Sequence, residues 1–350
     1  MADITLAGPS AQPISLEEEE PAPRFGFLQN GFVRTVGTRV LTAIPVLWGV
    51  TFLTFTIMNS LPGDAAEALL GANATPEEIH ALELKLHLNQ PFFTRYWHWL
   101  SGIVTGNLGS SLVSSQSVWS ILSQRLPVTF ELVGFAFVIS LAFAVPIAVL
   151  AAKRPGGIVD RLSLISSMVG LSVPGFVVAL ILILIFAVKL GWLPAIGFNN
   201  IGAGLWPNIK TLILPSLSIA LPLSGAYTRL LRADIRDQLL SEDYVLTARA
   251  KGASAWRVML RHVMRNAAFG LITLVGLNLG TLIGATVIIE SIFAIPGIGQ
   301  SLIQAINDRD IVVVEGAVLV FATCVVLSNL LTDIVYTLLD PRIRSGRSTS

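Results

Sequence analysis

The sequence predicts an all-α integral membrane protein with six transmembrane helices. Three observations support this fold class: 53% of the 350 residues are hydrophobic and only 13% are charged, the mean hydropathy is +0.73, and several uncharged stretches have membrane-spanning length. A soluble domain is about 25% charged, so too little polar surface remains for a water-soluble globular protein. The excess of apolar residues also excludes disorder over most of the chain.

A helix needs roughly 20 apolar residues to cross a hydrocarbon core of about 30 Å. Two uncharged stretches, 96–124 and 190–209, are rich in Gly, Ser, Asn and Pro. They are predicted as loops, because lipid cannot satisfy the backbone groups of irregular chain. Six stretches remain as helical spans: 40–63, 132–152, 162–188, 211–228, 266–289 and 316–332.

Prolines lie inside or near several of these spans. Proline is common in membrane helices, where it permits a kink, and we expect these residues to serve helix packing. They are Pro45, Pro146, Pro174, Pro215 and Pro222.

The basic residues are distributed unevenly between the two sides of the predicted spans. With a cytoplasmic N-terminus, 17 of the 23 Lys and Arg residues fall in cytoplasmic segments and 6 on the opposite side. Cytoplasmic loops of membrane proteins carry such an excess. The sequence therefore predicts a multi-pass membrane protein with both termini in the cytoplasm.

The chain divides into a large membrane domain between two polar tails. The tail 1–35 contains Glu17–Glu20 and no apolar core of signal-peptide type, so we expect it to be a disordered cytoplasmic segment. The six-helix domain is predicted over 36–344, with an outer loop at about 61–126 and an inner loop at about 229–265. A second cytoplasmic tail covers 345–350.

Composition and motifs exclude several classes of chemistry. The net charge of +1 does not indicate a nucleic-acid partner, and the single cysteine and four histidines form no metal-binding spacing. No Gly-Lys-Ser/Thr phosphate loop and no catalytic constellation occurs. The span interiors hold no ionisable residues, which pumps and secondary transporters use to coordinate a moving ion. We therefore expect a non-enzymatic chain that binds no metal or cofactor and depends on a downhill gradient or an energised partner.

Three glycines in the fifth predicted span repeat every four residues: Gly276, Gly280 and Gly284. Such a face lets a neighbouring helix backbone approach closely. Helix packing is the preferred interpretation, and lining a moving gate is the alternative.

The inner loop predicts a short helix, a break at Gly252 and a second short helix along the membrane surface. Small residues cluster at this break and arginines flank it. A small-residue turn with basic flanks is suited to inserting into a groove on another protein. A basic amphipathic segment resting on anionic lipid is the alternative.

This loop resembles the cytoplasmic coupling loop of ABC importer permeases in the dipeptide, oligopeptide and nickel branch. That branch carries a DYVxTARAKG element followed by RHxxxN, which match 243–252 and 261–266 here. Further elements match in order along the chain: Leu61-Pro62-Gly63-Asp64, the ExxFxxPGxG pattern of 290–299, Asp308-Arg309-Asp310, and the NLxxDxxYxxxDPR pattern of 329–342. The resemblance covers about 36–344, and the long outer loop fits the "B"-type permease.

The resemblance implies a type I ABC importer permease of the MetI-like fold in the bacterial inner membrane. Its expected partners are a second, homologous permease, two cytoplasmic ATPase subunits that bind ATP and Mg²⁺, and an extracytoplasmic solute-binding protein. Short peptides are the expected substrates. Nickel chelates, glutathione or other peptide-like solutes are the alternative, and a channel or facilitator is a rival from another class.

The resemblance also assigns candidate site residues. The ATPase-coupling set is Tyr244, Thr247, Ala248, Ala250, Lys251, Gly252, Ala253, Ser254, Arg257, Arg261, His262 and Asn266. The set at the outer gate and binding-protein dock is Asp64, Glu290, Phe293, Pro296, Gly297, Asp308, Arg309 and Asp310. Tight-turn chemistry and local charge pairing are the alternative explanation for the second set.

Three residues of the last predicted span share one helix face. Asn329, Asp333 and Tyr336 are spaced by four and three residues. We expect them to hold the inner end of this span to a neighbour.

Overall fold

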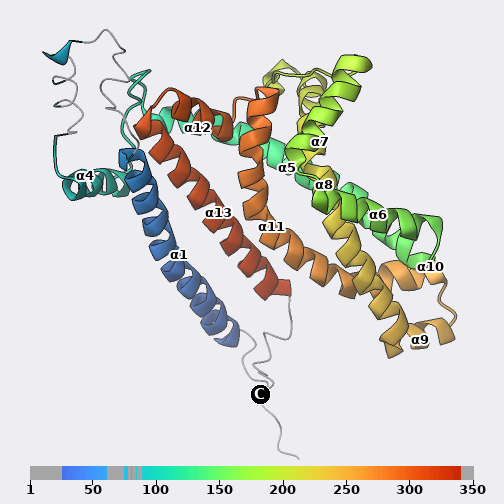
Figure 1. The fold of residues 1–350 in the computed structure, drawn as a ribbon. Helices are drawn as coiled ribbons and strands as arrows, with labels where there is room; N and C mark the ends of the chain where they lie inside the picture. Colours follow the sequence, from blue (N-terminus) through green and yellow to red (C-terminus); the bar gives the residue numbers. More distant parts are fainter. Residues whose placement is uncertain (1–25, 61–74, 78–79, 81–83, 85–88, 340–350) are drawn as a thin grey trace, which may run out of the picture.

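The computed structural model describes residues 26–60, 75–77, 80, 84 and 89–339, with side chains left aside for 26–36 and 336–339. The acidic run Glu17–Glu20, the C-terminal tail 345–350 and Asp64 lie outside the described residues. Within them the chain is helical apart from turns and one isolated bridge between Ser110 and Ser117. Figure 1 shows the helices as an elongated bundle, with α12 at one end and α9 and α10 at the other.

In the described part of the chain, five helices are long and apolar enough to cross a membrane, and a bent helix pair completes six spans. This result agrees with the six predicted spans. The five are α1 (Gly26–Ser60), α5 (Val118–Lys153), α8 (Leu205–Ser241), α11 (Met264–Phe293) and α13 (Ile311–Leu339). The bent pair is α6 (Ile158–Ser172) followed by α7 (Gly175–Leu182) and its π-helical continuation η1 (Ile183–Lys189).

The expectation of one continuous helix over 162–188 is wrong, because α6 and α7 meet at 106°. Val173, which precedes Pro174, is extended, with φ −98° and ψ 118°, as steric clash with a following proline ring favours. Pro174 then begins the new helix as its N-cap. Pro146 and Pro215, by contrast, lie within continuous helices.

Helices extend into three predicted loops, one of which is 190–209, where η2 (Ile201–Ala203) and the start of α8 lie. The stretch 96–124 contains most of α4 (Phe92–Val104) and the start of α5, so the outer loop ends before 126. Helix α4 buries Tyr96 against α1, and its exposed side carries both polar residues and the apolar side chains of Phe93 and Trp97. On the opposite side of the bundle, α8 runs on to Ser241 because Leu231 and Ile235 continue its buried face past Arg229.

Buried side chains form three clusters along the bundle. The middle cluster joins α5, α7, α8 and α11 through residues such as Leu132, Leu212 and Leu282. A second cluster lies toward α9 and contains Tyr227 and Leu231. The third joins α5, α12 (Ile298–Asn307) and α13. Helix α8 contributes to the first two clusters and packs against α5, α6, α7 and α11, so it is the central helix of the bundle.

Helix α1 lies at the edge of the bundle, beside α13 (Figure 1). At one end an ion pair joins Arg39 Nε to Asp333 Oδ2 at 2.9 Å. At the other end the rings of Phe55 and Tyr96 pack with centroids 5.3 Å apart, and the hydroxyls of Thr51 and Tyr96 lie 3.1 Å apart. These three contacts hold α1 against α13 and α4.

The three predicted packing glycines of α11 differ in their surroundings. A Cβ added at Gly276 would overlap the side chain of Thr332, and one at Gly280 would lie 3.0 Å from Cγ1 of Val325. Both glycines therefore let α11 approach α13 closely. Gly284 is exposed, and a Cβ there would meet nothing within 4 Å. Within the described chain, the close contact between α11 and α13 therefore involves Gly276 and Gly280 only.

We expect Gly276→Leu to destabilise the protein by about 1–3 kcal/mol, because the larger side chain forces α11 and α13 apart. Gly284→Leu is the matched control, since it adds the same side chain to the same helix in open space. Thermal melting of the purified variants measures the effect. Equal melting temperatures for the two variants would contradict close packing at Gly276.

Candidate functional site

A compact helical segment projects from the end of the bundle after α8. It consists of α9 (Asp243–Ala250), a turn, α10 (Ala255–Arg257) and the π-helical η3 (Val258–Val263), which continues into α11. Gly252 ends the first helix with φ +78°, a conformation that glycine adopts without strain. Its N–H donates to Arg249 O at 2.9 Å, and the N–H of Ala253 donates to Ala248 O at 3.1 Å.

The second short helix has its own cap. The hydroxyl of Ser254 accepts a hydrogen bond from the N–H of Arg257 at 3.4 Å. The expected pair of short helices with a break at Gly252 is therefore present. Capping at both sides of the turn gives this segment a defined shape.

Buried side chains hold this projecting segment against the bundle. Val245, Val258 and Met259 lie in the second core cluster, together with side chains of α5 and α8. The hydroxyl of Tyr244 also donates to Gln238 Oε1 of α8 at 2.5 Å. The segment therefore packs as a rigid extension of the spans.

The side of the segment that faces away from the bundle is exposed and mixed in character. A Cβ added at Gly252 would meet nothing within 4 Å. Three large apolar side chains, Leu246, Trp256 and Leu260, are 62%, 47% and 53% exposed. Nζ of Lys153 lies 5.0 Å from the centre of the Trp256 ring. Apolar side chains among charged ones on a projecting turn are typical of a protein-binding surface.

Some of the predicted coupling residues lie on this exposed surface, and the others lie half-buried between the surface and the bundle. The exposed ones are Thr247, Ala250, Lys251, Gly252, Ser254, Arg257, Arg261 and Asn266. The half-buried ones are Tyr244, Ala248, Ala253 and His262. The first group is available to a partner, and the second connects the surface to the core.

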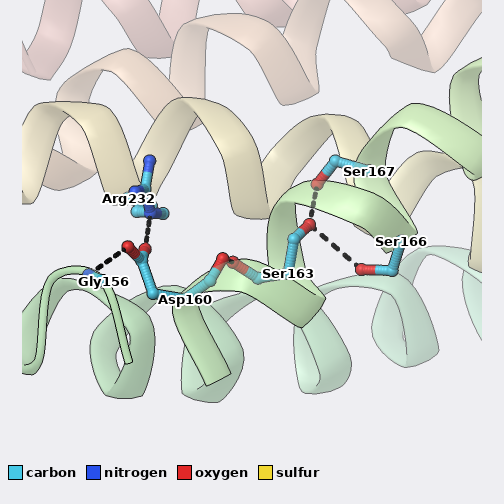
Figure 2. A network of polar contacts seen from close by, with 6 residues as sticks. All are labelled: Gly156, Asp160, Ser163, Ser166, Ser167 and Arg232. Carbon is cyan, nitrogen blue, oxygen red and sulfur yellow. Dashed lines mark hydrogen bonds and ion pairs between the residues drawn. The ribbon is translucent and has the colours of Figure 1, made fainter. Parts of the chain in front are cut away.

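A buried ion pair behind this segment joins α6 to α8 (Figure 2). Arg232 Nε binds Asp160 Oδ1, and the two side chains are only 11% and 5% exposed. The second carboxylate oxygen of Asp160 accepts from the N–H of Gly156 at 2.8 Å. Sequence reasoning missed this pair, although Asp160 is the only acidic residue between Glu131 and Asp234.

Beyond the ion pair, small residues bring α6 and α8 together. In α6 the hydroxyl of Ser163 donates to Asp160 O at 2.8 Å, and that of Ser167 to Ser163 O at 2.6 Å (Figure 2). These serines satisfy their own polarity within the helix, so their small side chains leave room for α8. A Cβ at Gly225 would lie 3.0 Å from Cα of Ser167. The bent third span is thus fixed directly to the central helix.

At the opposite end of the bundle, Glu290 organises the start of α12. The side chain is fully buried and accepts hydrogen bonds from Thr129 Oγ1 and from the N–H groups of Gly299 and Gln300, at 2.7, 2.7 and 3.1 Å. A Cβ at Gly297 would overlap this carboxylate. Glu290 therefore supplies acceptors for the free N–H groups of a helix N-terminus.

Two further members of the outer set have structural contacts. Phe293 is buried in the middle cluster, and its carbonyl accepts from the N–H of Gly197 at 2.8 Å. Pro296 lines a cavity beside α12. These placements fit the tight-turn explanation for 290–299.

The Asp308-Arg309-Asp310 turn joins α12 to α13. Asp310 is buried and accepts from Ser111 Oγ at 2.5 Å, from Leu112 N at 3.2 Å and from Val313 N at 3.3 Å. Arg309 is exposed with φ +55°, and Asp308 is exposed. The partners of Asp310 are therefore a distant loop and its own helix start, and not Arg309 as local pairing would require.

The residues expected to hold the last span are placed on α13. Asp333 makes the ion pair with Arg39 of α1 that is described above. Asn329 is exposed, and the side chain of Tyr336 lies outside the described set. One of the three residues thus links α13 to a neighbouring span.

Comparison with known proteins places this arrangement in a family. Residues 144–345 match the model of the binding-protein-dependent transport system inner membrane component, and residues 32–133 match the N-terminal model of the same membrane components. The chain belongs to this permease family. The first match contains the helices α6 to α13, and with them the projecting segment.

Relatives of this permease match over nearly their whole length. A probable peptide ABC transporter permease of Sinorhizobium fredii is 37% identical over 87% of this chain and 97% of its own. The dipeptide transport system permease DppB of Alkalihalophilus pseudofirmus is 36% identical over 87% and 98%. The glutathione transport system permease GsiC of Escherichia coli is 36% identical over 87% and 97%.

We expect Asp160→Leu to destabilise the permease by about 3–5 kcal/mol, because the guanidinium of Arg232 stays buried without its partner. The double variant Asp160→Leu/Arg232→Met removes both charges and should recover most of the loss. Asp243→Leu, at an exposed acidic residue of α9, is the control and should have little effect. Thermal melting of the purified variants measures these effects. An equal loss of stability in the single and double Asp160 variants would contradict a stabilising ion pair.

Proposed function

We propose that this permease forms, with a second homologous permease, the membrane pathway of an ATP-driven importer of short peptides. Two cytoplasmic ATPase subunits bind ATP and Mg²⁺ and dock on the projecting segment, and an extracytoplasmic binding protein delivers the solute. The observation that carries the proposal is the capped turn at Gly252, which is exposed at its tip and fixed to the spans at its base. The names of the peptide and dipeptide permease relatives support the substrate class.

The geometry suits the transmission of force from a soluble partner to the membrane. A partner that grips the tip at Gly252 moves α9 and η3, whose buried side chains pack on α5 and α8. The ion pair of Asp160 and Arg232 then connects α8 to the bent third span. The ATPases supply the free-energy difference between inward-open and outward-open arrangements, and this chain converts their closure into helix movement.

Glutathione is the second candidate substrate. The GsiC relative is as similar to this chain as the DppB relative, at 36% identity over 87% of the chain. Because glutathione is itself peptide-like, the same pathway chemistry serves both candidates. Profiling the ligands of the co-purified binding protein by mass spectrometry separates them.

The proposed orientation places both termini and the projecting segment in the cytoplasm. Ser115 and Asn200 lie on the α12 side of the bundle, and Ser241 lies at the end of α8 beside α9. In a Cys324→Ser background, we expect cysteines at Ser115 and Asn200 to react with a membrane-impermeant thiol reagent in intact cells. A cysteine at Ser241 should react only after the membrane is opened, and its labelling in intact cells would reverse the orientation.

We expect the reconstituted wild-type complex to import di- and tripeptides only with ATP and the binding protein present. Gly252→Trp should lower both peptide uptake and peptide-stimulated ATP hydrolysis by about tenfold or more, because the bulky ring prevents the tip from seating. Gly252→Asn is the matched control. Asparagine tolerates the left-handed conformation better than most residues and stays small, so this variant should retain most activity.

The lipid-resting alternative predicts another order of effects. If the segment binds anionic lipid, Arg257→Ala and Arg261→Ala should impair transport more than Gly252→Trp, since each basic residue contributes about 1 kcal/mol at a charged membrane surface. Normal assembly of the two permeases in every variant is the control for folding. Full activity of Gly252→Trp would overturn the coupling role, and solute flux through the permease alone would favour a channel.

A further inference from the structure

A polar cavity lies at the end of the bundle opposite the projecting segment. Its volume is about 620 Å³, within the range of about 300–1,000 Å³ that is usual for small-molecule sites. The walls come from the loop Ser111–Gln116, from α5, from α12 and from the turn that leads into α13. Segments distant in sequence, including the loop of Phe198 and Asn200, line this partly open cavity, so it is a built feature of the fold.

Arg125 of α5 supplies the positive charge of this cavity. The side chain is half-buried and forms no hydrogen bond or ion pair within the part of the chain that the structure describes. Glu290 acts on it electrostatically, but both Glu290 oxygens already accept from Thr129, Gly299 and Gln300. The guanidinium therefore keeps its planar set of donors free for an anionic ligand, and a carboxylate matches that geometry.

Asp308 supplies a negative charge to the same cavity. Its carboxylate makes no hydrogen bond or ion pair to any residue that the structure describes, and in particular none to Arg125. The other lining carboxylate, Asp310, is already occupied by Ser111, Leu112 and Val313. The available charges are thus one cation and one anion that do not neutralise each other.

Neutral polar groups complete the lining. The amide side chains of Gln116 and Gln304 line the cavity and offer both donors and acceptors. The apolar side chains of Val128 and Phe198 lie beside them. The lining thus combines the two charged side chains with amide groups and apolar surface, which suits a short peptide.

We propose that this cavity binds a short peptide by its two charged termini, with Arg125 holding the terminal carboxylate and Asp308 the terminal ammonium. The inference rests on the proposed function, since it places the imported peptide on the permease itself. Its volume limits the ligand to a few residues. A buried loop of a protein partner, which has no free termini, is the competing occupant and is distinguished by the test.

The test measures how peptides protect a cysteine in the cavity of the purified transport complex. Gln304→Cys in a Cys324→Ser background places a thiol in the wall, at an exposed position. We expect trialanine to slow its reaction with a polar maleimide. Trialanine amide and N-acetyl trialanine should protect the cysteine at least about tenfold more weakly than trialanine, because each lacks one charged end.

Variants assign each end of the peptide to a residue. In Arg125→Gln, trialanine and its amide should protect equally, and in Asp308→Asn trialanine and its N-acetyl form should protect equally. Arg125→Lys retains the charge and should keep part of the preference for the free carboxylate. Lys210→Gln, which removes an exposed charge outside the cavity, should leave both preferences unchanged.

Several outcomes would overturn the inference: no protection by trialanine, unchanged preferences in the Arg125 and Asp308 variants, or protection by the binding protein without peptide. Uptake of trialanine by the reconstituted wild-type complex is measured in parallel. Uptake without cavity protection rejects the cavity site and leaves the proposed function standing. Cavity protection without uptake rejects the proposed function and supports the site.

Discussion

Lipid offers no hydrogen-bond partners, so a membrane protein must itself supply partners for the backbone N–H and C=O groups at the ends of its helices. In this permease buried carboxylates meet that need at three turns of the described chain. Glu290 accepts from the first N–H groups of α12, and Asp310 accepts from Val313 at the start of α13 and from Leu112 of a distant loop. Asp160 does the same for Gly156 ahead of α6. These contacts determine where the helices begin, and the cavity and the inner segment are built on the helices they position.

The central helix α8 connects the two ends of the molecule. It packs in the middle cluster and again in the cluster beside α9. The projecting segment therefore packs on α5 and α8, and Arg232 joins α8 to α6. The cavity at the other end lies between α5 and α12, so α5 is the element that contacts both the projecting segment and the cavity.

Sequence analysis could predict those features that depend on composition and local pattern. Six spans follow from apolar length, and the turn at Gly252 follows from small residues with arginines on both sides. The break at Pro174 could not be predicted in this way, because Pro146 and Pro215 leave their helices continuous. The difference lies in tertiary packing. A Cβ added at Gly175 would lie only 3.2 Å from Ser218 O, so glycine at this position lets α7 pack closely on α8.

Contacts between residues distant in sequence could not be predicted either. Arg232 is 72 residues from Asp160, and Thr129 is 161 residues from Glu290, so no local pattern connects them. The same limit explains why sequence analysis did not select Arg125, which entered only the count of basic residues predicted for the outer side. Its significance comes from the cavity wall that other segments complete.

The attachment of α1 has a consequence for how the protein is made. Its ion pair, Arg39 with Asp333, joins residues 294 positions apart, and its neighbour in the bundle is α13. A ribosome releases α1 long before α13 exists, since chains emerge at about 5–20 residues per second. During that interval α1 can contact α4 but not α13, while the helices from α5 to α11 can already pack on one another. Among the described spans, α1 can therefore make its contacts with α13 only after the helices between them have been synthesised.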